Sequence, residues 1–357
     1  MEQYFIALMI SFIAAVLFTP LVKKLAIKIG AVDKPNDRKV HQGVMPRLGG
    51  LAIFLAVAVG VIYFQPISPF FLPIMLGAFI IIVTGILDDL FELSPKLKLI
   101  GQIVAASVVI LGGIKVEFIN LPFDGRLELG LFTIPLTLLW IIGVTNAINL
   151  IDGLDGLSAG VSSIVLATIA TMAYVNGNFF VLGLSMIMLG ASLGFLIFNF
   201  HPAKIFMGDT GSLFLGFMLS VLSLLGFKNI TLFSLLVPAM ILAVPISDTL
   251  FAIIRRAVNR KPLSAPDKSH LHHCLLRLGY SHRQTVLMIY AMSAFFSLCA
   301  ILFSQTTLWV SVAIILIVLF IIEIIIELVG LVDEEYKPLL KFLRRVFPKR
   351  EGLSHKK

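Results

Sequence analysis

Charged residues are scarce in this chain of 357 residues: Asp, Glu, Lys and Arg make up 13% of it, against about 25% in an ordinary soluble domain. Hydrophobic residues make up 59%, and the mean hydropathy is +1.02. This composition excludes a soluble globular protein, a disordered chain and a nucleic-acid-binding module. Cysteine is also rare, with two residues in the whole chain, so a disulfide framework is not expected.

Long apolar runs dominate what is present. They lack the alternation of a strand, and a helix satisfies its own backbone hydrogen bonds in lipid, so we expect each run to cross the membrane as a helix. The eleven runs are 3–22, 49–65, 70–87, 99–114, 131–151, 157–175, 179–200, 211–227, 232–254, 286–304 and 308–328. The sequence therefore predicts an all-α polytopic integral membrane protein with 10–11 transmembrane helices.

Basic residues are distributed unequally between the two sides of the predicted bundle. With the N-terminus outside, all of the 28 Lys and Arg residues except Lys115, Arg126 and Lys228 fall on the cytoplasmic side. Positive charge favours that side, so we expect an outside N-terminus and a cytoplasmic C-terminus. On the outside, residues 115–130 surround an Asp124-Gly125 turn signal and predict a small β-hairpin.

The chain divides into two unequal parts. Residues 1–330 are expected to form one multi-span domain, and residues 331–357 a basic cytoplasmic tail. Within the tail, residues 336–350 mix apolar and basic side chains. They fit an amphipathic helix on the inner membrane surface and a solvated basic tail about equally well.

Two carboxylates, Asp88 and Asp89, end the third apolar run at the predicted cytoplasmic side. Polar groups at the edge of a bilayer are functional candidates, because burying them is costly. Adjacent carboxylates repel each other, so the pair suits a metal site or a general base. A solvated pair that caps the following loop is the plainer interpretation.

A second polar group follows the fifth run, with one member at every third position. Its members are Asn146, Asn149, Asp152 and Asp155. On an unbroken helix, steps of three residues would send the first and last to opposite faces. Gly153 and Gly156 allow the backbone to turn, so we expect the four side chains to converge near a ligand.

Two further clusters lie at the predicted cytoplasmic side. Asp209 stands between glycines before the eighth run and could be a plain N-cap, but Asn199, Lys204 and Phe206 nearby favour a functional role. The last inner loop, 255–285, carries three histidines with basic residues around them, which suits a phosphate anion. We do not expect zinc there, because a zinc site needs three or four ligands with closed spacing and no second Cys or His group lies nearby in the sequence. The remaining histidines of the inner loops, His41, His201 and His282, are isolated in the sequence.

Carboxylate and amide oxygens favour Mg²⁺ over Zn²⁺, with Mn²⁺ as a second hard ion. Together with the basic residues, histidines and glycine turns, they indicate phosphoryl transfer at the membrane boundary. A GxxxxGK[ST] nucleotide-binding loop is missing, which argues against an ATP-driven pump. A multi-span transporter is the alternative from another class, although its site would lie near the bilayer midplane. A structural scaffold would leave the polar clusters unexplained.

Five strings, spread in order over roughly residues 1–330, carry a resemblance to a known family: DKPNDRKVHQGVMPRLGG, LDDLFELSPKLKL, NAINLIDGLDGL, FNFHPAKIFMGDTGSLFLG and DKSHLHH. The chain resembles the polyprenyl-phosphate N-acetylhexosamine-1-phosphate transferases of glycosyltransferase family 4. The His-x-His-His string is similar to the WecA/TagO branch. That resemblance implies transfer of GlcNAc-1-phosphate from UDP-GlcNAc to undecaprenyl phosphate at the plasma membrane, with release of UMP. The MraY branch, which transfers phospho-MurNAc-pentapeptide, is the alternative within the family.

The resemblance also implies roles for individual residues. Asp88 and Asp89 would deprotonate the lipid phosphate and help to hold Mg²⁺, and Asn149 and Asp209 would ligate it. Asp209 and His273 would also be catalytic. The predicted nucleotide-sugar contacts are Asp152, Gly153, Asp155, Asn199, Phe206, His270 and His272.

Three points stay open at the level of the sequence. The MraY branch commonly has a Lys where this chain has Glu92, so Lys96 or Lys98 would take the role of that lysine. The transfer could be direct or could pass through an aspartyl-phosphate. A homodimer is also compatible with the sequence.

Overall fold

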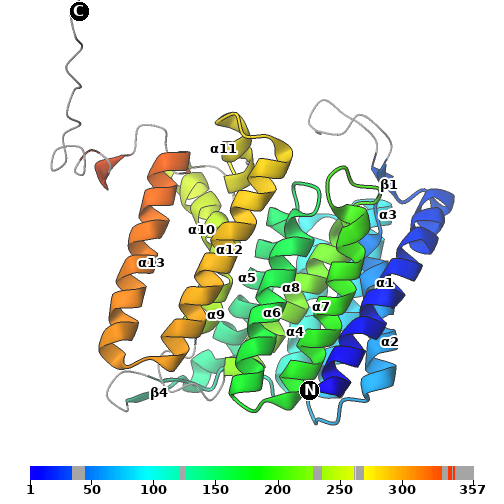
Figure 1. The fold of residues 1–357 in the computed structure, drawn as a ribbon, viewed down its shortest axis with the longest axis horizontal. Coiled ribbons are helices and arrows are strands. Elements are labelled where there is room, and N and C mark those ends of the chain that lie inside the picture. The colour runs from blue at the N-terminus through cyan, green and yellow to red at the C-terminus, as the bar shows by residue number, and fades with distance from the viewer. Residues whose placement is uncertain are drawn as a thin grey trace, which may run out of the picture.

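The computed structural model describes residues 1–33, 45–120, 125–227, 235–260, 262, 269–331, 337–339 and 341. The helices are α1 (Glu2–Ile29), α2 (Gly49–Phe64), α3 (Phe71–Phe91), α4 (Pro95–Leu111), α5 (Thr133–Ile151), α6 (Leu157–Val175), α7 (Phe179–Asn199), α8 (Gly208–Phe227), α9 (Leu236–Ile241), α10 (Ala243–Val258), α11 (Leu271–Arg277), α12 (His282–Gln305) and α13 (Leu308–Val329). The long helices stand side by side in one bundle (Figure 1). The N-terminus lies at one end of that bundle and α11 at the other.

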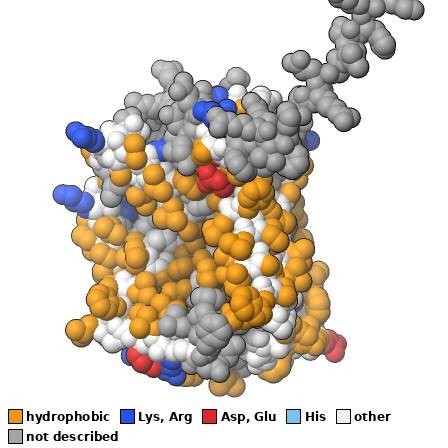
Figure 2. Space-filling model, turned by 90° about the vertical axis from the view of Figure 1, so that its left-hand side faces the viewer, with side chains coloured by type: hydrophobic (Ala, Val, Ile, Leu, Met, Phe, Trp, Pro, Cys, Tyr) orange, Lys and Arg blue, Asp and Glu red, His pale blue; other side chains and the backbone are white. Residues whose placement is uncertain are grey.

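The prediction of an all-α polytopic membrane protein is confirmed. Eight of the described helices are long and apolar enough to cross a membrane, and α2 is apolar but only 16 residues long. The eight are α1, α3, α5, α6, α7, α8, α12 and α13. Figure 2 shows hydrophobic side chains over the middle of one face, with Lys and Arg towards its two ends.

The ninth expected segment is broken into two helices. The apolar run 232–254 was expected to be one span, but α9 ends at Ile241 and α10 begins at Ala243. Pro245 has no amide hydrogen to donate to the carbonyl of Ile241, so an uninterrupted helix would lose a hydrogen bond at this point. The segment 255–285, expected to be one long loop, also contains the end of α10, all of α11 and the start of α12.

The predicted hairpin is present. Strand β3 (Phe118–Asn120) pairs antiparallel with β4 (Arg126–Glu128), and Ile119 lies opposite Leu127. Most of the connecting turn, including Asp124, lies outside the described residues. A second small pair, β1 (Val32–Asp33) with β2 (Met45–Pro46), lies at the other end of the bundle (Figure 1) and leads into α2.

The predicted amphipathic helix at 336–350 lies mostly outside the described residues, and the division of the chain at residue 330 stays a prediction. Within its described part, the amide of Leu339 donates to Glu327 Oε1 at 2.6 Å. Glu327 is fully buried in α13. This hydrogen bond gives a polar residue of the last apolar run a partner.

Helix α8 lies at the centre of the bundle and packs against α2, α3, α5 and α6. At two of these contacts, glycines allow the backbones of the two helices to touch. A Cβ on Gly50 of α2 would overlap the backbone of Gly211, and one on Gly85 of α3 would overlap that of Thr210. The first turn of α8 is thereby held tightly between α2 and the end of α3.

We predict that Gly50→Ala destabilises the protein, because neither backbone in this contact can yield without moving a helix. Overpacking of this kind costs about 1–3 kcal/mol. Gly143→Ala is the matched control, since a Cβ there meets nothing within 4 Å. Thermal unfolding in detergent should show a lower Tm for the first variant and an unchanged or higher Tm for the second. Equal Tm values would contradict the close α2–α8 contact.

Candidate active site

Asp89 caps the first turn of α8 from a neighbouring helix. Its Oδ1 accepts from the amide of Asp209 at 2.9 Å, and its Oδ2 accepts from the amide and the hydroxyl of Thr210 at 3.1 and 2.6 Å. The amides of a helix N-terminus need acceptors and favour negative charge. Asp89 therefore joins the end of α3 to the start of α8 and uses both carboxylate oxygens to do so.

Asp88 and Asp209 meet across the same junction, with Lys98 between them. Lys98 Nζ lies 3.1 Å from Asp88 Oδ2 and 2.8 Å from Asp209 Oδ2. Lys98 belongs to the first turn of α4, which Ser94 caps and Pro95 begins. Lys96, the other candidate for the lysine role, is exposed, so the structure places Lys98 at the carboxylates.

Arg47 is the second cation beside these carboxylates. Its guanidinium lies 3.5 Å from Asp33, 3.6 Å from Asp89 and 4.0 Å from Asp209. Burial alone would lower the pKa of Arg47, but the charges of Asp89, Asp33 and Asp209 outweigh it and raise the pKa. The side chain remains 23% exposed, so this fixed positive charge is open to an anion arriving from water.

Asn146 and the three polar residues that follow it do not converge on one point, contrary to the expectation. Asn146 exchanges two hydrogen bonds with Gln102 of α4, at 2.6 and 3.3 Å. Asn149 donates to Ser212 of α8 at 2.8 Å, which leaves its Oδ1 as the atom for a ligand. Because α5 continues unbroken to Ile151, the side chains of Asn146 and Asn149 point in different directions around the helix axis.

Asp152 and Asp155 follow the end of α5 and point to different neighbours. Burial, reinforced by the charges of Asp209 and Asp89, raises the pKa of Asp152 to about 8. Asp152 therefore lies in the electrostatic field of the acidic junction, the name used here for Asp88, Asp89, Asp209 and Lys98 where α3 meets α8. Asp155 instead lies 2.8 Å from His201 Nδ1 and accepts from the amide of Ala203.

The predicted histidines lie beside the turn that carries Asp152. His272 is buried against Gly153, where a Cβ would overlap the imidazole ring. Burial, followed by the neighbouring His273, lowers the pKa of His272 to about 3, so the ring is neutral at pH 7. The rings of His272 and His273 lie 4.2 Å apart, and His273 is less buried than His272.

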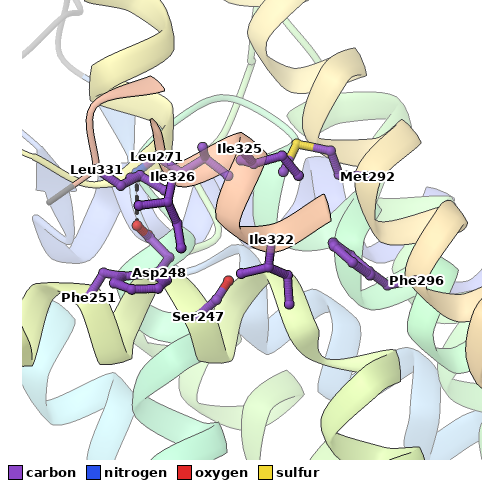
Figure 3. A pocket seen from close by; sticks show the side chains of 10 residues that line it. All are labelled: Ser247, Asp248, Phe251, Leu271, Met292, Phe296, Ile322, Ile325, Ile326 and Leu331. Carbon is purple, nitrogen blue, oxygen red and sulfur yellow. Dashed lines mark hydrogen bonds between the residues drawn. The ribbon is translucent and has the colours of Figure 1, made fainter. Parts of the chain in front are cut away.

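Asp248 orients residues 270–273, which are called the histidine segment below. The sequence did not single out Asp248 as a site residue. Its Oδ2 lies 3.0 Å from His270 Nδ1, and its Oδ1 accepts from the amide of Leu271 at 2.8 Å. Figure 3 shows Asp248 of α10 directed at Leu271, beside an apolar cavity of about 10 Å³ lined also by α12 and α13. Burial of the Asp248 carboxylate among apolar side chains is costly unless it is hydrogen-bonded. The contacts with His270 and Leu271 supply those hydrogen bonds.

Asn199 and Phe206 hold the loop between α7 and α8. Asn199 accepts from the amide of Gly156 and donates to the carbonyl of Ile205, at 3.1 and 3.0 Å. The amide of Phe206 donates to Pro46, and its carbonyl accepts from Gly49. These contacts give Asn199 a bracing role; contact of either side chain with a nucleotide stays a prediction.

Most of the predicted site residues thus lie in one connected region at the end of the bundle that carries α11. The acidic junction and the histidine segment meet at the turn formed by Asp152 and Gly153. Sequence reasoning did not single out Arg47, although it belongs to the PRLGG string. Asp248 was also missed, because a single Asp in an apolar run gives no sign that its partners are His270 and Leu271 of a distant segment.

The residues of the acidic junction fit a hard divalent cation. Asp88 Oδ1 is buried and has no hydrogen-bond partner among the described residues. Asp209 is its carboxylate neighbour, and Asn149 Oδ1 is an amide oxygen from α5. Oxygen-only donors of this kind suit Mg²⁺ or Mn²⁺. The unpartnered oxygen of Asp88 belongs to this set and is free to accept a cation or a proton.

Comparison with known proteins places the chain in a family. It is 52% identical to a Bacillus subtilis protein named "Probable undecaprenyl-phosphate N-acetylglucosaminyl 1-phosphate transferase", over 97% of this chain and 98% of that protein. The chain belongs to glycosyl transferase family 4. The family model matches residues 71–227, which include the acidic junction and the turn at Asp152.

More distant relatives agree with this assignment. A Mycolicibacterium smegmatis decaprenyl-phosphate N-acetylglucosaminephosphotransferase is 36% identical, over 76% of this chain and 75% of that protein. A Salmonella typhi undecaprenyl-phosphate alpha-N-acetylglucosaminyl 1-phosphate transferase is 31% identical, over 78% of each chain. The resemblance seen in the five strings is therefore confirmed as membership of glycosyl transferase family 4.

We predict that Asp89→Asn and Asp88→Asn differ in stability although the two residues are adjacent. An amide at position 89 would turn its NH₂ towards a donor of α8, which costs about 1–3 kcal/mol. At position 88, Oδ1 accepts no hydrogen bond and Lys98 keeps Asp209. Thermal unfolding in detergent should show the larger loss of Tm for Asp89→Asn. The reverse order would contradict the capping role of Asp89.

Proposed function

We propose that this chain is the enzyme that transfers GlcNAc-1-phosphate from UDP-GlcNAc to undecaprenyl phosphate and releases UMP. The observation that carries the proposal is the junction of Asp88, Asp209 and Lys98, which combines a cation-binding oxygen set with a fixed positive charge. The names of the relatives support a GlcNAc donor and a polyprenyl phosphate acceptor.

Asp88 is suited to deprotonate the lipid phosphate. Its Oδ1 accepts no hydrogen bond from the described residues, whereas both oxygens of Asp89 are used in capping α8. The deprotonated phosphate oxygen forms a bond to the β-phosphorus of UDP-GlcNAc. The bond from that phosphorus to the bridging oxygen breaks, and UMP leaves with the oxygen.

Asp209 and Asn149 would hold Mg²⁺ through their side-chain oxygens, which leaves Asp88 Oδ1 for the proton of the lipid phosphate. The bound ion would supply neutralising charge to the pyrophosphate of the donor. Lys98 and Arg47 add fixed positive charge around the same anion, which stabilises the negative charge of a phosphoryl transition state. Lys98 also separates the carboxylates of Asp88 and Asp209 before a substrate arrives.

The histidine segment supports the sugar phosphate in this proposal. His272 is neutral because of its lowered pKa, so it donates or accepts one hydrogen bond without adding charge. His270 is fixed by Asp248, and His273, which is less buried than His272, would contact the ligand. Phe206 and the turn at Asp152 and Gly153 form the remaining nucleotide side of the site.

The reaction is the first membrane step of a cell-wall polymer such as teichoic acid or a related glycan. The MraY alternative is less favoured, because the relatives compared are named for N-acetylglucosaminyl transfer. A transporter is less favoured, because the acidic junction lies at the ends of α3 and α8 and away from the middle of the bundle.

We predict that the purified protein converts UDP-GlcNAc and undecaprenyl phosphate to a labelled lipid and UMP in the presence of Mg²⁺. UDP-MurNAc-pentapeptide should give little or no product, since a site built around a small sugar leaves no room for a long acidic peptide. The measurement is kcat/KM for both donors on the same preparation. A preference for the pentapeptide donor would disprove the GlcNAc assignment and leave the family assignment intact.

The same assay tests the role of Asp209. The variant Asp209→Asn keeps the size of the side chain and removes its charge. We expect activity to fall by at least about 10²-fold, because phosphoryl transfer depends on electrostatic stabilisation at the metal. Normal turnover in a folded variant would return Asp209 to a plain helix-start residue.

We further propose that the site faces the cytoplasm, from the distribution of Lys and Arg in the sequence. A reporter fused after Lys357 should therefore be active in the cytoplasm, and one inserted after Gly125 in the β3–β4 hairpin should be active outside. The hairpin lies at the end of the bundle opposite α11 (Figure 1). Reporters active on the same side, or on the reverse sides, would reject this orientation.

A further inference from the structure

Three side chains that are distant in the sequence meet at the turn between α5 and α6. Asp155 comes from the turn between α5 and α6, His201 from the loop after α7, and His282 from the first residue of α12. A potential ligand atom from each lies within 4.8 Å of the other two. The group contains two imidazole nitrogens and one carboxylate oxygen.

The contacts within this group hold its members close together. His201 Nδ1 lies 2.8 Å from Asp155 Oδ2, and the same oxygen accepts from the amide of Ala203 at 3.1 Å. The rings of His201 and His282 are stacked, with centroids 4.2 Å apart and planes 22° apart. Each of the three side chains is therefore oriented by a neighbour before any ligand is bound.

One atom of the group lacks a partner. Nε2 of His282 is buried and has no hydrogen-bond partner among the described residues. An unsatisfied buried nitrogen costs about 1–3 kcal/mol. Coordination of a cation by this nitrogen would remove that cost.

The surroundings also resemble the outer shell of a metal site. Metal-binding histidines are usually oriented by a hydrogen bond to a carbonyl or carboxylate. In this group the ring of His201 is held by the carboxylate of Asp155, and the ring of His282 stacks on that of His201. Arg283 Nη2 donates to the carbonyl of His201 at 3.2 Å and fixes the backbone of the loop.

We propose that Asp155, His201 and His282 form a binding site for a Zn²⁺-class divalent ion, separate from the oxygen-only junction of Asp88 and Asp209. Two imidazoles with one carboxylate suit a borderline-soft ion better than Mg²⁺. Three protein ligands leave a fourth position, and the side chain of His201 is 37% exposed, so water or a ligand can reach it. The proposal does not depend on the transferase activity.

The geometry requires a small adjustment on binding. Tetrahedral Zn²⁺ with ligands at about 2.0–2.1 Å keeps them roughly 3.3 Å apart. The 2.8 Å contact between His201 and Asp155 must therefore open slightly as the ion replaces their shared proton. A bound ion would then join three loops at the end of the bundle that carries the turn of Asp152 and Gly153.

The test is zinc binding by the purified full chain in detergent. After treatment with a chelator, the protein is dialysed against Zn²⁺ with millimolar Mg²⁺, so that Mg²⁺ competes at the oxygen-only junction. We expect about one tightly bound zinc in the wild type. His201→Ala and His282→Ala should each bind at least about tenfold more weakly, since even outer-shell changes cost about 10–100-fold. His273→Ala is the matched histidine control and should keep the zinc.

Absence of zinc from the folded wild type would overturn the proposal, as would full binding in both His201→Ala and His282→Ala. Loss of zinc in His273→Ala alone would place the ion at the histidines of α11 and would also overturn it. The absorption spectrum of the wild type with Co²⁺ needs no variant. Intense bands of four-coordinate Co²⁺ support the site, and the weak bands of six-coordinate Co²⁺ reject it.

Discussion

The structure depends on the burial of negative charge where α3 meets α8. Asp88 and Asp89 are each less than 10% exposed, and Asp209 lies directly beside Asp88. Buried charges are tolerated only when they are paired or bind an ion. Two fixed cations, Lys98 and Arg47, and the amides of the first turn of α8 provide the pairing. The same positive charges remain available to a phosphate group, so the interactions that permit the fold also prepare the site.

This requirement explains why small residues surround the junction. A Cβ at Gly208 would overlap the carboxylate of Asp89, and one at Gly85 would overlap the backbone of Thr210. The positive φ of Gly208 also permits the sharp turn into α8. The amides of α8 can reach Asp89 only when the two helices approach this closely. Packing of glycine against backbone is thus a condition for the electrostatics of the site.

The sequence alone predicted the all-α membrane fold, the hairpin and most of the residues that gather in the candidate site, because apolar runs and polar clusters are local patterns. It was wrong about the ninth segment, where Pro245 breaks the helix, and about the convergence of Asn146 with its three successors. It could not choose between Lys96 and Lys98, because both follow Asp89 at similar distances in the chain. The direction of α4, fixed by its cap at Ser94, makes that choice.

The expectation about zinc shows where reasoning from spacing ends. The sequence argued against zinc at the clustered histidines of the last inner loop, and in the structure one of these rings is buried against Gly153 and another is held by Asp248. His201 and His282 were set aside because each stands alone in the sequence. The packing of α12 against α6 brings the loop of Asp155 to the start of α12. A ligand set assembled by helix packing has no fixed spacing along the chain, so three-dimensional contacts are required to find it.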